Sequence, residues 1–328
     1  MKRTNEPKID KGETTMKKYG FGVDIGGTTI KMSLFEMTGH MVDKWEIPTN
    51  TSDHGSSILD DVAAVIEGRL VSDGISKEDV EGIGIGVPGP VVEDSVVVCC
   101  VNLGWGRVDV AKELSEKTGL KVRVGNDANV AALGEMWQGG GKGYKNVIMI
   151  TLGTGVGGGI IIDGKIINGS NGAGGEIGHV FVDEAEEEKC GCGKCGCLEQ
   201  YASATGIVRL AKRALAADGR DSALRSVENL SAKAVADAAK AGDALALEVL
   251  EKMGKILGTA LANAACIVDP EVFVIGGGVS KAGTIITEVI RKYYIERAFQ
   301  SCRNADFALA QLGNDAGVYG CVYLLLNS

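Results

Sequence analysis

The chain contains 328 residues, of which 43 are acidic and 34 are basic, and its formal net charge is −9. This length is sufficient to bury a large core and favours two domains or lobes over one. Nucleic-acid affinity depends mainly on cations that neutralise phosphates, so an acidic chain without a basic block is a poor nucleic-acid binder. The apolar runs all fall short of the roughly 18 residues that a membrane span requires. We therefore expect neither nucleic acid nor a membrane as a partner.

The nine cysteines fall into two groups. Four lie between residues 190 and 197, and the other five lie mostly in apolar segments, where we expect buried thiols. The odd count, the clustered spacing and the absence of a secretory signal favour a reducing, cytoplasmic compartment. Residues 1–18 are polar and charged, so we expect a flexible N-terminal arm there, with Met16 as an alternative start of translation.

Apolar strands alternate with glycine-rich turns, and the pattern occurs twice. A strand at 19–23 leads into the first glycine turn (residues 24–29), and strands at 30–35 and 41–47 follow. A strand at 147–151 leads into the second glycine turn (residues 152–159), and strands at 160–162 and 165–167 flank an Asp-Gly pair, a strong hairpin signal. We interpret the two as halves of a duplicated fold. Glycine, at 48 residues, is about twice as frequent as usual, which we attribute to loops that approach ligands.

The remaining elements follow from periodicity and from turn residues. The expected strands are 82–87, ending at Pro88, then 96–102, 121–124 and 271–275. The expected helices are 56–72, 109–118, 130–137, 198–217, 232–268 with an interruption near Gly242, 283–298 and 316–326. We expect the last helix to pack back on the first lobe.

The glycine turns are candidate phosphate sites. Gly153, Gly155 and Gly158 satisfy G-x-G-x-x-G, but a dinucleotide site requires a helix directly afterwards, and here a strand follows. Backbone N–H groups and threonine hydroxyls of such turns can hold phosphate oxygens, although a plain tight hairpin is the alternative. Asp24, at the end of its strand, is placed to hold magnesium through water. The third glycine turn (residues 276–278) follows a strand and opens a helix, a nucleotide-binding arrangement that we assign to adenosine.

Asn126 and Asp127 precede the helix expected at 130–137. Either residue could cap that helix. The alternative is catalytic, with the Asp127 carboxylate accepting a proton from a substrate hydroxyl. The position between two phosphate-type turns favours the catalytic role, with one residue acting on the substrate while its neighbour caps.

The stretch from Gly174 to Glu199 combines Glu176, His179, four cysteines and Glu199. Zinc favours tetrahedral sites of thiolate and imidazole, and Cys190, Cys192, Cys197 and His179 form such a set, with Cys195 as a fifth candidate. Glu176 and His179 are three residues apart and would share one face of a helix. The alternative is that this Glu-x-x-His pair simply lies on a solvated helix face, as such pairs usually do. A closed metal loop would carry Glu199 towards Glu176. We predict a metal-bound loop that directs acidic side chains at a polar ligand.

These motifs together resemble the ROK family of sugar kinases and repressors, in the actin-like superfamily, from about Tyr19 to the end. The resemblance implies an α/β, two-lobed actin-like and hexokinase-like (ribonuclease H-like) ATPase fold with a duplicated β-β-β-α-β-α core. Residues 19–123 and 314–328 would form a small lobe, and residues 124–313 a large lobe that carries the zinc loop. The family commonly forms dimers or tetramers, so a homo-oligomer is expected.

By the same resemblance the ligands would be ATP, Mg²⁺, a structural Zn²⁺ and a sugar. Asp127 would be the base, and Cys195 falls at a variable position outside the zinc site. The sugar would be bound by Asn126, Asp127, Glu176, His179 and Glu199. The zinc ligands would be His179, Cys190, Cys192 and Cys197. The nucleotide and its metal would be bound by Asp24, Gly26, Gly27, Thr28, Thr29, Lys31, Gly153, Thr154, Gly155, Gly276, Gly277 and Gly278.

Within the family, residues 102–105 and 198–203 are most similar to those of bacterial glucokinases. This implies transfer of the γ-phosphoryl group of ATP to the 6-hydroxyl of glucose. The alternatives are N-acetylmannosamine, N-acetylglucosamine or fructose as the sugar, polyphosphate as the donor, or a sugar-sensing protein without turnover. Family repressors carry a DNA-binding segment of several dozen residues before the first phosphate motif; only 23 residues precede Asp24 here, which favours the kinase.

Overall fold

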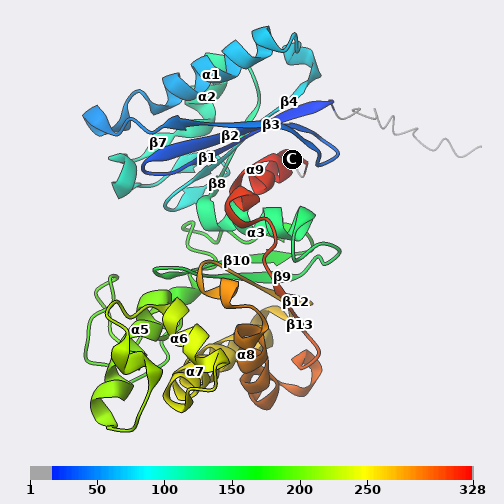
Figure 1. Cartoon of the computed structure of the whole chain (residues 1–328). Helices are drawn as coiled ribbons and strands as arrows, with labels where there is room; N and C mark the ends of the chain where they lie inside the picture. Colours follow the sequence, from blue (N-terminus) through cyan, green and yellow to red (C-terminus); the bar gives the residue numbers. More distant parts are fainter. Residues whose placement is uncertain (1–16, 327–328) are drawn as a thin grey trace, which may run out of the picture.

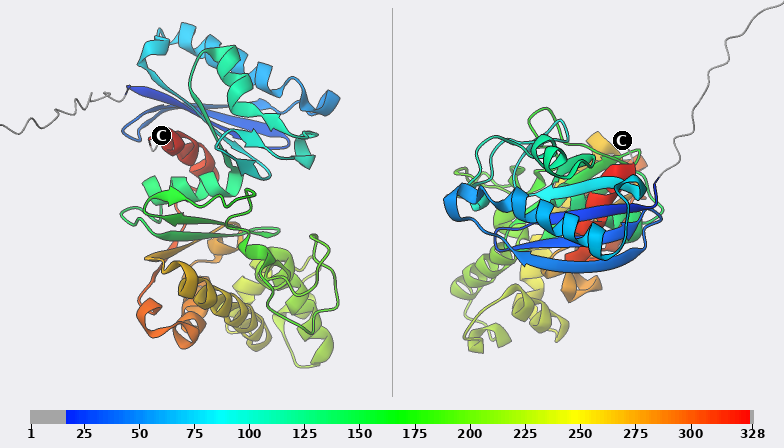
Figure 2. Two further views of the ribbon diagram at one scale, coloured as in Figure 1. Left: turned by 180° about the vertical axis from the view of Figure 1, so that it is seen from behind. Right: turned by 90° about the horizontal axis from the view of Figure 1, so that it is seen from above.

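The computed structural model describes residues 17–326, so the arm expected at residues 1–18 lies, apart from its last two residues, outside the described part. Two five-stranded sheets are stacked with helices between them and helices on both outer sides (Figure 1). Figure 2 shows the same order of layers from behind. Among residues 17–326, no helix is long and apolar enough to cross a membrane.

The first sheet has the order β3-β2-β1-β4-β8. Strands β1, β2 and β3 are antiparallel neighbours, and β1, β4 and β8 run parallel. Helices α1 (Ile58–Ser72) and α2 (Val110–Thr118) cover its outer face (Figure 1). The strands are β1 (Tyr19–Ile25), β2 (Thr29–Glu36), β3 (Met41–Pro48), β4 (Val80–Val87) and β8 (Val122–Asn126). A small separate sheet is formed by β5 (Val91–Val92), β6 (Val96–Val97) and β7 (Val108–Asp109).

The second sheet has the order β11-β10-β9-β12-β13. When the strands of each sheet are numbered in chain order, both sheets have the spatial order 3-2-1-4-5. This shared order confirms the duplicated core. The strands are β9 (Val147–Leu152), β10 (Val156–Ile162), β11 (Lys165–Ile166), β12 (Val272–Gly276) and β13 (Asp306–Leu309). The outer helices are α5 (Ala204–Ala217), α6 (Ala232–Lys240), α7 (Ala244–Val268) and α8 (Thr284–Arg297).

Two helices lie between the sheets, and each packs on the sheet that did not precede it. Helix α3 (Asp127–Gln138) follows β8 of the first sheet but packs on β9 and β10 of the second. Helix α9 (Ala316–Leu326) follows β13 of the second sheet but packs on β1 and β4 of the first, as expected for the last helix. The two helices also pack on each other, so they join the two halves of the molecule.

Glycines make this packing close enough. A Cβ atom on Gly134 of α3 would lie 2.1 Å from the carbonyl oxygen of Ala316, and one on Gly320 of α9 would lie 1.6 Å from that of Val130. In the first sheet, a Cβ atom on Gly84 would lie 1.7 Å from the carbonyl oxygen of Cys321. The interpretation that the glycine excess serves ligand loops was therefore incomplete, because part of it lets helices approach backbone.

Several sequence expectations need correction. The strand expected at 96–102 is only β6, after which a 3₁₀ turn (Val101–Leu103) follows. The helix expected at 198–217 is divided into α4 (Glu199–Ala202) and α5, because Ser203 is extended and its hydroxyl caps α5 by accepting from the Gly206 N–H. The lobe boundary expected between residues 123 and 124 falls inside β8, all of which pairs with β4. Cys99 and Cys266, expected to be buried, are exposed.

The close crossing of α3 and α9 predicts a strong asymmetry between two glycine substitutions. Gly320→Ala should lower the free energy of unfolding by about 3 kcal/mol, the upper end for overpacking, because the new methyl group meets the Val130 carbonyl. Gly68→Ala is the control, since Gly68 also lies within a helix but has open space around it. That change should be neutral or stabilising by about 0.5–1 kcal/mol. Urea unfolding followed by circular dichroism measures both, and equal effects would contradict the close crossing.

Candidate functional site

Three strand ends of the first sheet bring Asp24 and Asp127 to one edge. Asp24 is in register with Gly86 of β4, and Gly86 is in register with Gly125 of β8. The three strands are parallel, so their carboxyl ends meet at the same edge, where open α/β sheets bind ligands. Asp127 follows β8 directly and begins α3.

Asp24 lies against the start of α9. A Cβ atom on Gly317 would be 2.6 Å from Asp24 Oδ2, so only glycine leaves room for the carboxylate. Burial raises the pKa of Asp24 to about 6; nearby Lys31 opposes the increase, and the Asp127 carboxylate adds to it. Lys31 Nζ donates to the carbonyl of Asn314 at 3.1 Å. Asp24 and Lys31 are thus both in contact with the segment that begins α9.

Asn126 and Asp127 divide two roles. Asn126 forms the N-cap of α3, because its Oδ1 accepts from the N–H groups of Ala128 (3.0 Å) and Asn129 (3.2 Å). Its Nδ2 donates to the Gly89 carbonyl at 3.1 Å, which fixes the side chain after β4. Asp127 Oδ1 accepts from Ala128 N–H at 2.8 Å, and Asp127 is an exposed residue.

The environment of Asp127 disfavours its charged form. Asp127 as a whole residue is exposed, but protein atoms around its carboxylate remove part of its water, and this desolvation raises its pKa. Hydrogen bonds from the Ala128 N–H and Asn126 oppose the increase, and the negative charge of Glu176 adds to it. Asp127 therefore lies near enough to Glu176 to be influenced by its charge, and near enough to Asp24 to influence the pKa there.

The second and third glycine turns are adjacent at the carboxyl ends of β9 and β12. These strands are parallel, with Gly276 in register with Thr151. A Cβ atom on Gly277 would lie 2.5 Å from the Leu152 carbonyl oxygen, so the third turn rests directly on the start of the second. The second turn is closed by a hydrogen bond from Gly153 N–H to the Gly155 carbonyl at 3.0 Å. Both turns leave backbone accessible, since Thr154, Gly277 and Gly278 are exposed.

A cavity of about 330 Å³ opens beside the third turn. Of its lining, sequence reasoning identified only Gly278. The contribution of helix α6 was missed, because nothing local in that helix indicates which cavity it borders. The other lining residues belong to α6 and its N-cap, to the 3₁₀ turn Val279–Ala282 and to the start of α5: Ala204, Ser231, Ala232, Lys233, Ala236, Asp237, Lys240, Val279, Lys281 and Ala282. A second cavity of about 510 Å³ includes Thr154, Thr205 and Arg209.

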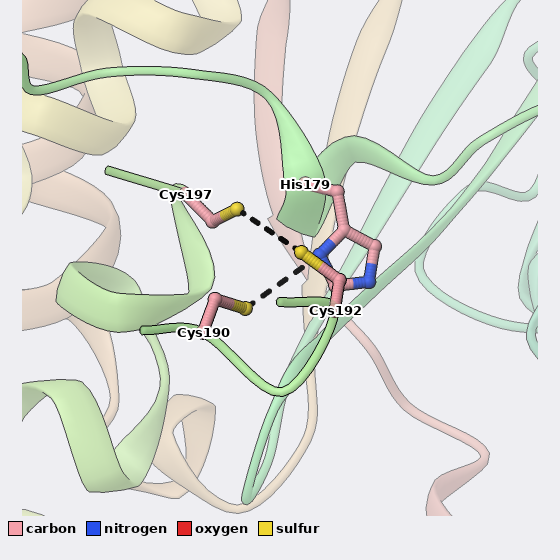
Figure 3. A group of neighbouring side chains, drawn as sticks. All are labelled: His179, Cys190, Cys192 and Cys197. Carbon is pink, nitrogen blue, oxygen red and sulfur yellow. Dashed lines mark hydrogen bonds between the residues drawn. The ribbon is translucent and has the colours of Figure 1, made fainter. Parts of the chain in front are cut away.

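His179 and three cysteines converge on one point (Figure 3). Their ligand atoms all lie within 4.8 Å of one another, with His179 Nδ1 at 3.9 Å from Cys190 Sγ and Cys192 Sγ at 3.6 Å from Cys197 Sγ. With zinc–sulfur bonds of about 2.3 Å, the edges of a tetrahedral site measure about 3.8 Å, so the residues fit zinc. Cys195 lies outside this group and directs its thiol to the Glu187 carbonyl at 3.5 Å.

Glu176 and His179 flank a single 3₁₀ turn rather than an α-helix. Glu176 is the N-cap residue of the turn Ile177–His179, and the His179 N–H donates to the Glu176 carbonyl at 3.1 Å. Glu176 lies outside the helical region, with φ −68° and ψ 50°, so the common helix face expected for Glu176 and His179 stays a prediction.

Glu199 joins the second glycine turn to the cysteines. Its Oε2 accepts from Val156 N–H at 2.9 Å, and the Cys190 thiol donates to its Oε1 at 3.5 Å. A Cβ atom on Gly155 would lie 2.1 Å from the same carboxylate. Each carboxylate oxygen has two lone pairs, so Glu199 retains acceptor capacity for a ligand. Its place links the candidate sugar residues to the candidate phosphate turn.

The cysteine loop (residues 183–197) is anchored on α5 by a buried carboxylate that sequence reasoning missed. The Glu186 side chain is 1% exposed and accepts from Arg213 through both guanidinium nitrogens at 3.0 Å and from the Tyr201 hydroxyl at 2.8 Å. These donors, Arg213 foremost, lower the pKa of Glu186 to about 2. An acidic run such as 183–188 reads as a solvated segment in the sequence, and only the fold shows the arginine beneath it.

Two sheets of identical strand order, each with a glycine turn at its edge, and a shared acidic site define the class of two-lobed, actin-like phosphotransferase folds. Residues 20–328 match the ROK family, and the chain belongs to that family. The glucokinase of Halalkalibacterium halodurans is 47% identical over 94% of this chain and 95% of that protein. The glucokinase of Thermotoga maritima is 35% identical over 93% of this chain and 96% of its own length. A solved ROK family glucokinase from Streptomyces griseus, in complex with glucose and AMPPNP, is 35% identical with a TM-score of 0.71, covering 94% of this chain and 100% of that chain.

The geometry of the cysteine loop predicts which thiols bind the metal ion and which do not. We expect the wild-type protein to bind one zinc ion per chain. Cys192→Ser should bind well below one and melt at a lower temperature, because the free energy of metal binding contributes to folding. Cys195→Ser is the matched control, since its thiol lies outside the group, and it should retain zinc. Inductively coupled plasma mass spectrometry measures the metal. Equal zinc in the Cys192 variant, or zinc loss in the control, would contradict the assignment.

Proposed function

We propose that the chain is a sugar kinase that transfers the γ-phosphoryl group of Mg·ATP to the 6-hydroxyl of glucose. The observation that carries this proposal is the placement of Asp24 and Asp127 at one edge of the first sheet, where three parallel strands end beside a phosphate-type turn. The relatives named above as glucokinases, and the Streptomyces griseus structure with glucose and an ATP analogue, support glucose and ATP as the substrates.

The donor side consists of the three glycine turns. Backbone N–H groups of the first and second turns, with the hydroxyls of Thr28, Thr29 and Thr154 and the Lys31 ammonium, would hold the phosphates. The adenosine would occupy the cavity beside Gly276, Gly277 and Gly278. Asp24 would hold the magnesium through water, and the ion would supply neutralisation of the charge that develops between the β- and γ-phosphates.

The acceptor side consists of carboxylates and amides that bind vicinal hydroxyls. Asn126, Glu176, His179 and Glu199 would orient the sugar, and Asp127 would accept the proton of its 6-hydroxyl. As that oxygen forms its bond to the γ-phosphorus, the bond to the bridging oxygen breaks and ADP leaves. Catalysis in such reactions depends chiefly on positioning and electrostatics, which is the contribution that a fixed N-terminal helix residue can make.

A zinc ion held by His179 and the cysteine loop would link the stability of this loop to sugar binding, because His179 would contact both the metal and the sugar. Its Nδ1 faces Cys190, so a metal ligated there leaves Nε2, on the opposite side of the ring, available to the sugar. Ligating histidines are normally oriented by the partner of their second nitrogen. Glu199 would stay beside the same loop through the chain itself, because it closely follows the zinc ligand Cys197. The hydrogen bond from the Cys190 thiol to Glu199 would be lost on ligation, since zinc binds the thiolate.

The role of Asp127 is tested by Asp127→Asn. We expect kcat to fall by at least roughly a hundredfold, the lower end for loss of a general base, while glucose affinity by calorimetry changes only a few-fold. Asp163→Asn is the matched control, because Asp163 lies in the β10–β11 turn with φ 51°, a conformation that asparagine adopts readily. Turnover is measured as ADP release coupled to an indicator enzyme. The same assay with glucose, N-acetylmannosamine, N-acetylglucosamine and fructose identifies the preferred sugar. Near-normal turnover in the Asp127 variant would remove it from the role of base.

The pKa shift at Asp127 predicts the acid limb of the pH profile. A base must be ionised, so kcat/KM for glucose should fall as pH decreases through the raised pKa of Asp127, at a pH above the ordinary aspartate value of about 3.9. Glu176→Gln removes a charge that raises this pKa and should move the midpoint to lower pH, whatever its effect on the maximal value. A midpoint that does not move would assign the limb to another group, such as Asp24.

A further inference from the structure

Glu135 is a completely buried carboxylate in the last turn of α3, with an exposed fraction of 0%. Its hydrogen-bond partners are backbone N–H groups. Oε1 accepts from Gln311 (3.1 Å) and Leu312 (2.8 Å), and Oε2 accepts from Gln311 (2.9 Å) and Gly140 (2.8 Å). A carboxylate is suited to this position because it only accepts, and all the groups around it donate.

The amides that Glu135 holds belong to the segment by which the chain returns from the second sheet to the first. This segment, residues 310–315, connects β13 to α9. The backbone packs tightly there: a Cβ atom on Gly139 would lie 2.0 Å from Glu135 Oε2, and one on Gly140 would lie 2.2 Å from the Leu309 carbonyl oxygen. Glu135 therefore fixes where α9 begins relative to the end of α3.

The held segment continues directly into contacts with the donor-side residues. Lys31 Nζ donates to the Asn314 carbonyl, Lys44 pairs with Asp315 at 2.8 Å, and Gly317 lies against the Asp24 carboxylate. At the other end of α3, Asp127 lies eight residues before Glu135, about 12 Å along the helix axis. One helix thus carries both the acceptor-side carboxylate and the group that fixes the donor side.

We infer that Glu135 is a positioning residue for phosphoryl transfer, which aligns Asp24 and Lys31 with Asp127 by fixing the start of α9 on the end of α3. The inference rests on the proposed function. Loss of the carboxylate removes the acceptor of the part-buried N–H groups of residues 311 and 312, and leaving such donors unpaired is the costly case for a hydrogen bond. The segment must then shift to find water. A shift of about 1 Å in such a support costs roughly a hundredfold in rate.

The test compares two glutamate variants of the full-length protein. Glu135→Gln keeps the shape but turns an amide NH₂ group towards donors, and kcat at saturating glucose and ATP should fall by roughly tenfold to a hundredfold. KM for glucose should stay within about threefold, because the sugar residues are not in contact with this segment. Glu271→Gln is the control, since Glu271 also accepts two backbone N–H groups, from Lys145 and Asn146 at 2.8 Å, but at the start of β9. It should leave kcat unchanged.

Each kcat is calculated per mole of folded protein, and the folded fraction is measured by circular dichroism at the assay temperature. Glu135→Asp is the second variant, because it retains a carboxylate drawn back by one methylene group; it should fold and show an intermediate kcat. Wild-type kcat in a folded Glu135 variant, or equal losses in the Glu135 and Glu271 variants, would overturn the inference while the kinase proposal stands. A wild-type protein that releases no ADP with any hexose would instead overturn the proposed function, and the inference with it.

Discussion

The close contact between α3 and α9 is the constraint on which the rest of the structure depends. Each helix leaves one sheet and packs on the other, so the two halves of the molecule are joined by a shared layer and not merely by a linker. The contact is possible because Gly134 and Gly320 let each helix approach the backbone of its partner. Interiors are packed without spare volume, so this layer transmits position from one sheet to the other.

The same layer explains where the candidate site lies. Helix α3 begins with Asp127, and helix α9 begins beside Asp24, so the exchange of helices brings the proposed acceptor side and the proposed donor side to one place. The cysteine loop adds the third wall, because Glu199 joins it to the second glycine turn. This loop is anchored by the ion pair between its own Glu186 and Arg213 of α5. Buried charge, close packing and the candidate metal site therefore lie next to one another around this site.

Local patterns predicted much of this from the sequence, and long-range contacts account for what they missed. The strands, the glycine turns and the interruption at Gly242 could be predicted because each depends on residues that are neighbours in the sequence. The same holds for the cysteine cluster, which lies beside His179 in the structure. The break at Ser203 was missed because a helical apolar pattern continues across a capping hydroxyl. Burial of Glu135 and Glu186 was missed as well, since their partners lie far along the chain. The roles proposed for the site residues remain predictions.

The central claim is that this site transfers a phosphoryl group from ATP to the 6-hydroxyl of glucose, and identification of the product tests it most directly. The purified protein is incubated with Mg·ATP and glucose, and the mixture is followed by phosphorus NMR and mass spectrometry. The account predicts glucose 6-phosphate and ADP in equal amounts. Phosphate on another hydroxyl, or ATP consumed to free phosphate without a sugar phosphate, would contradict it.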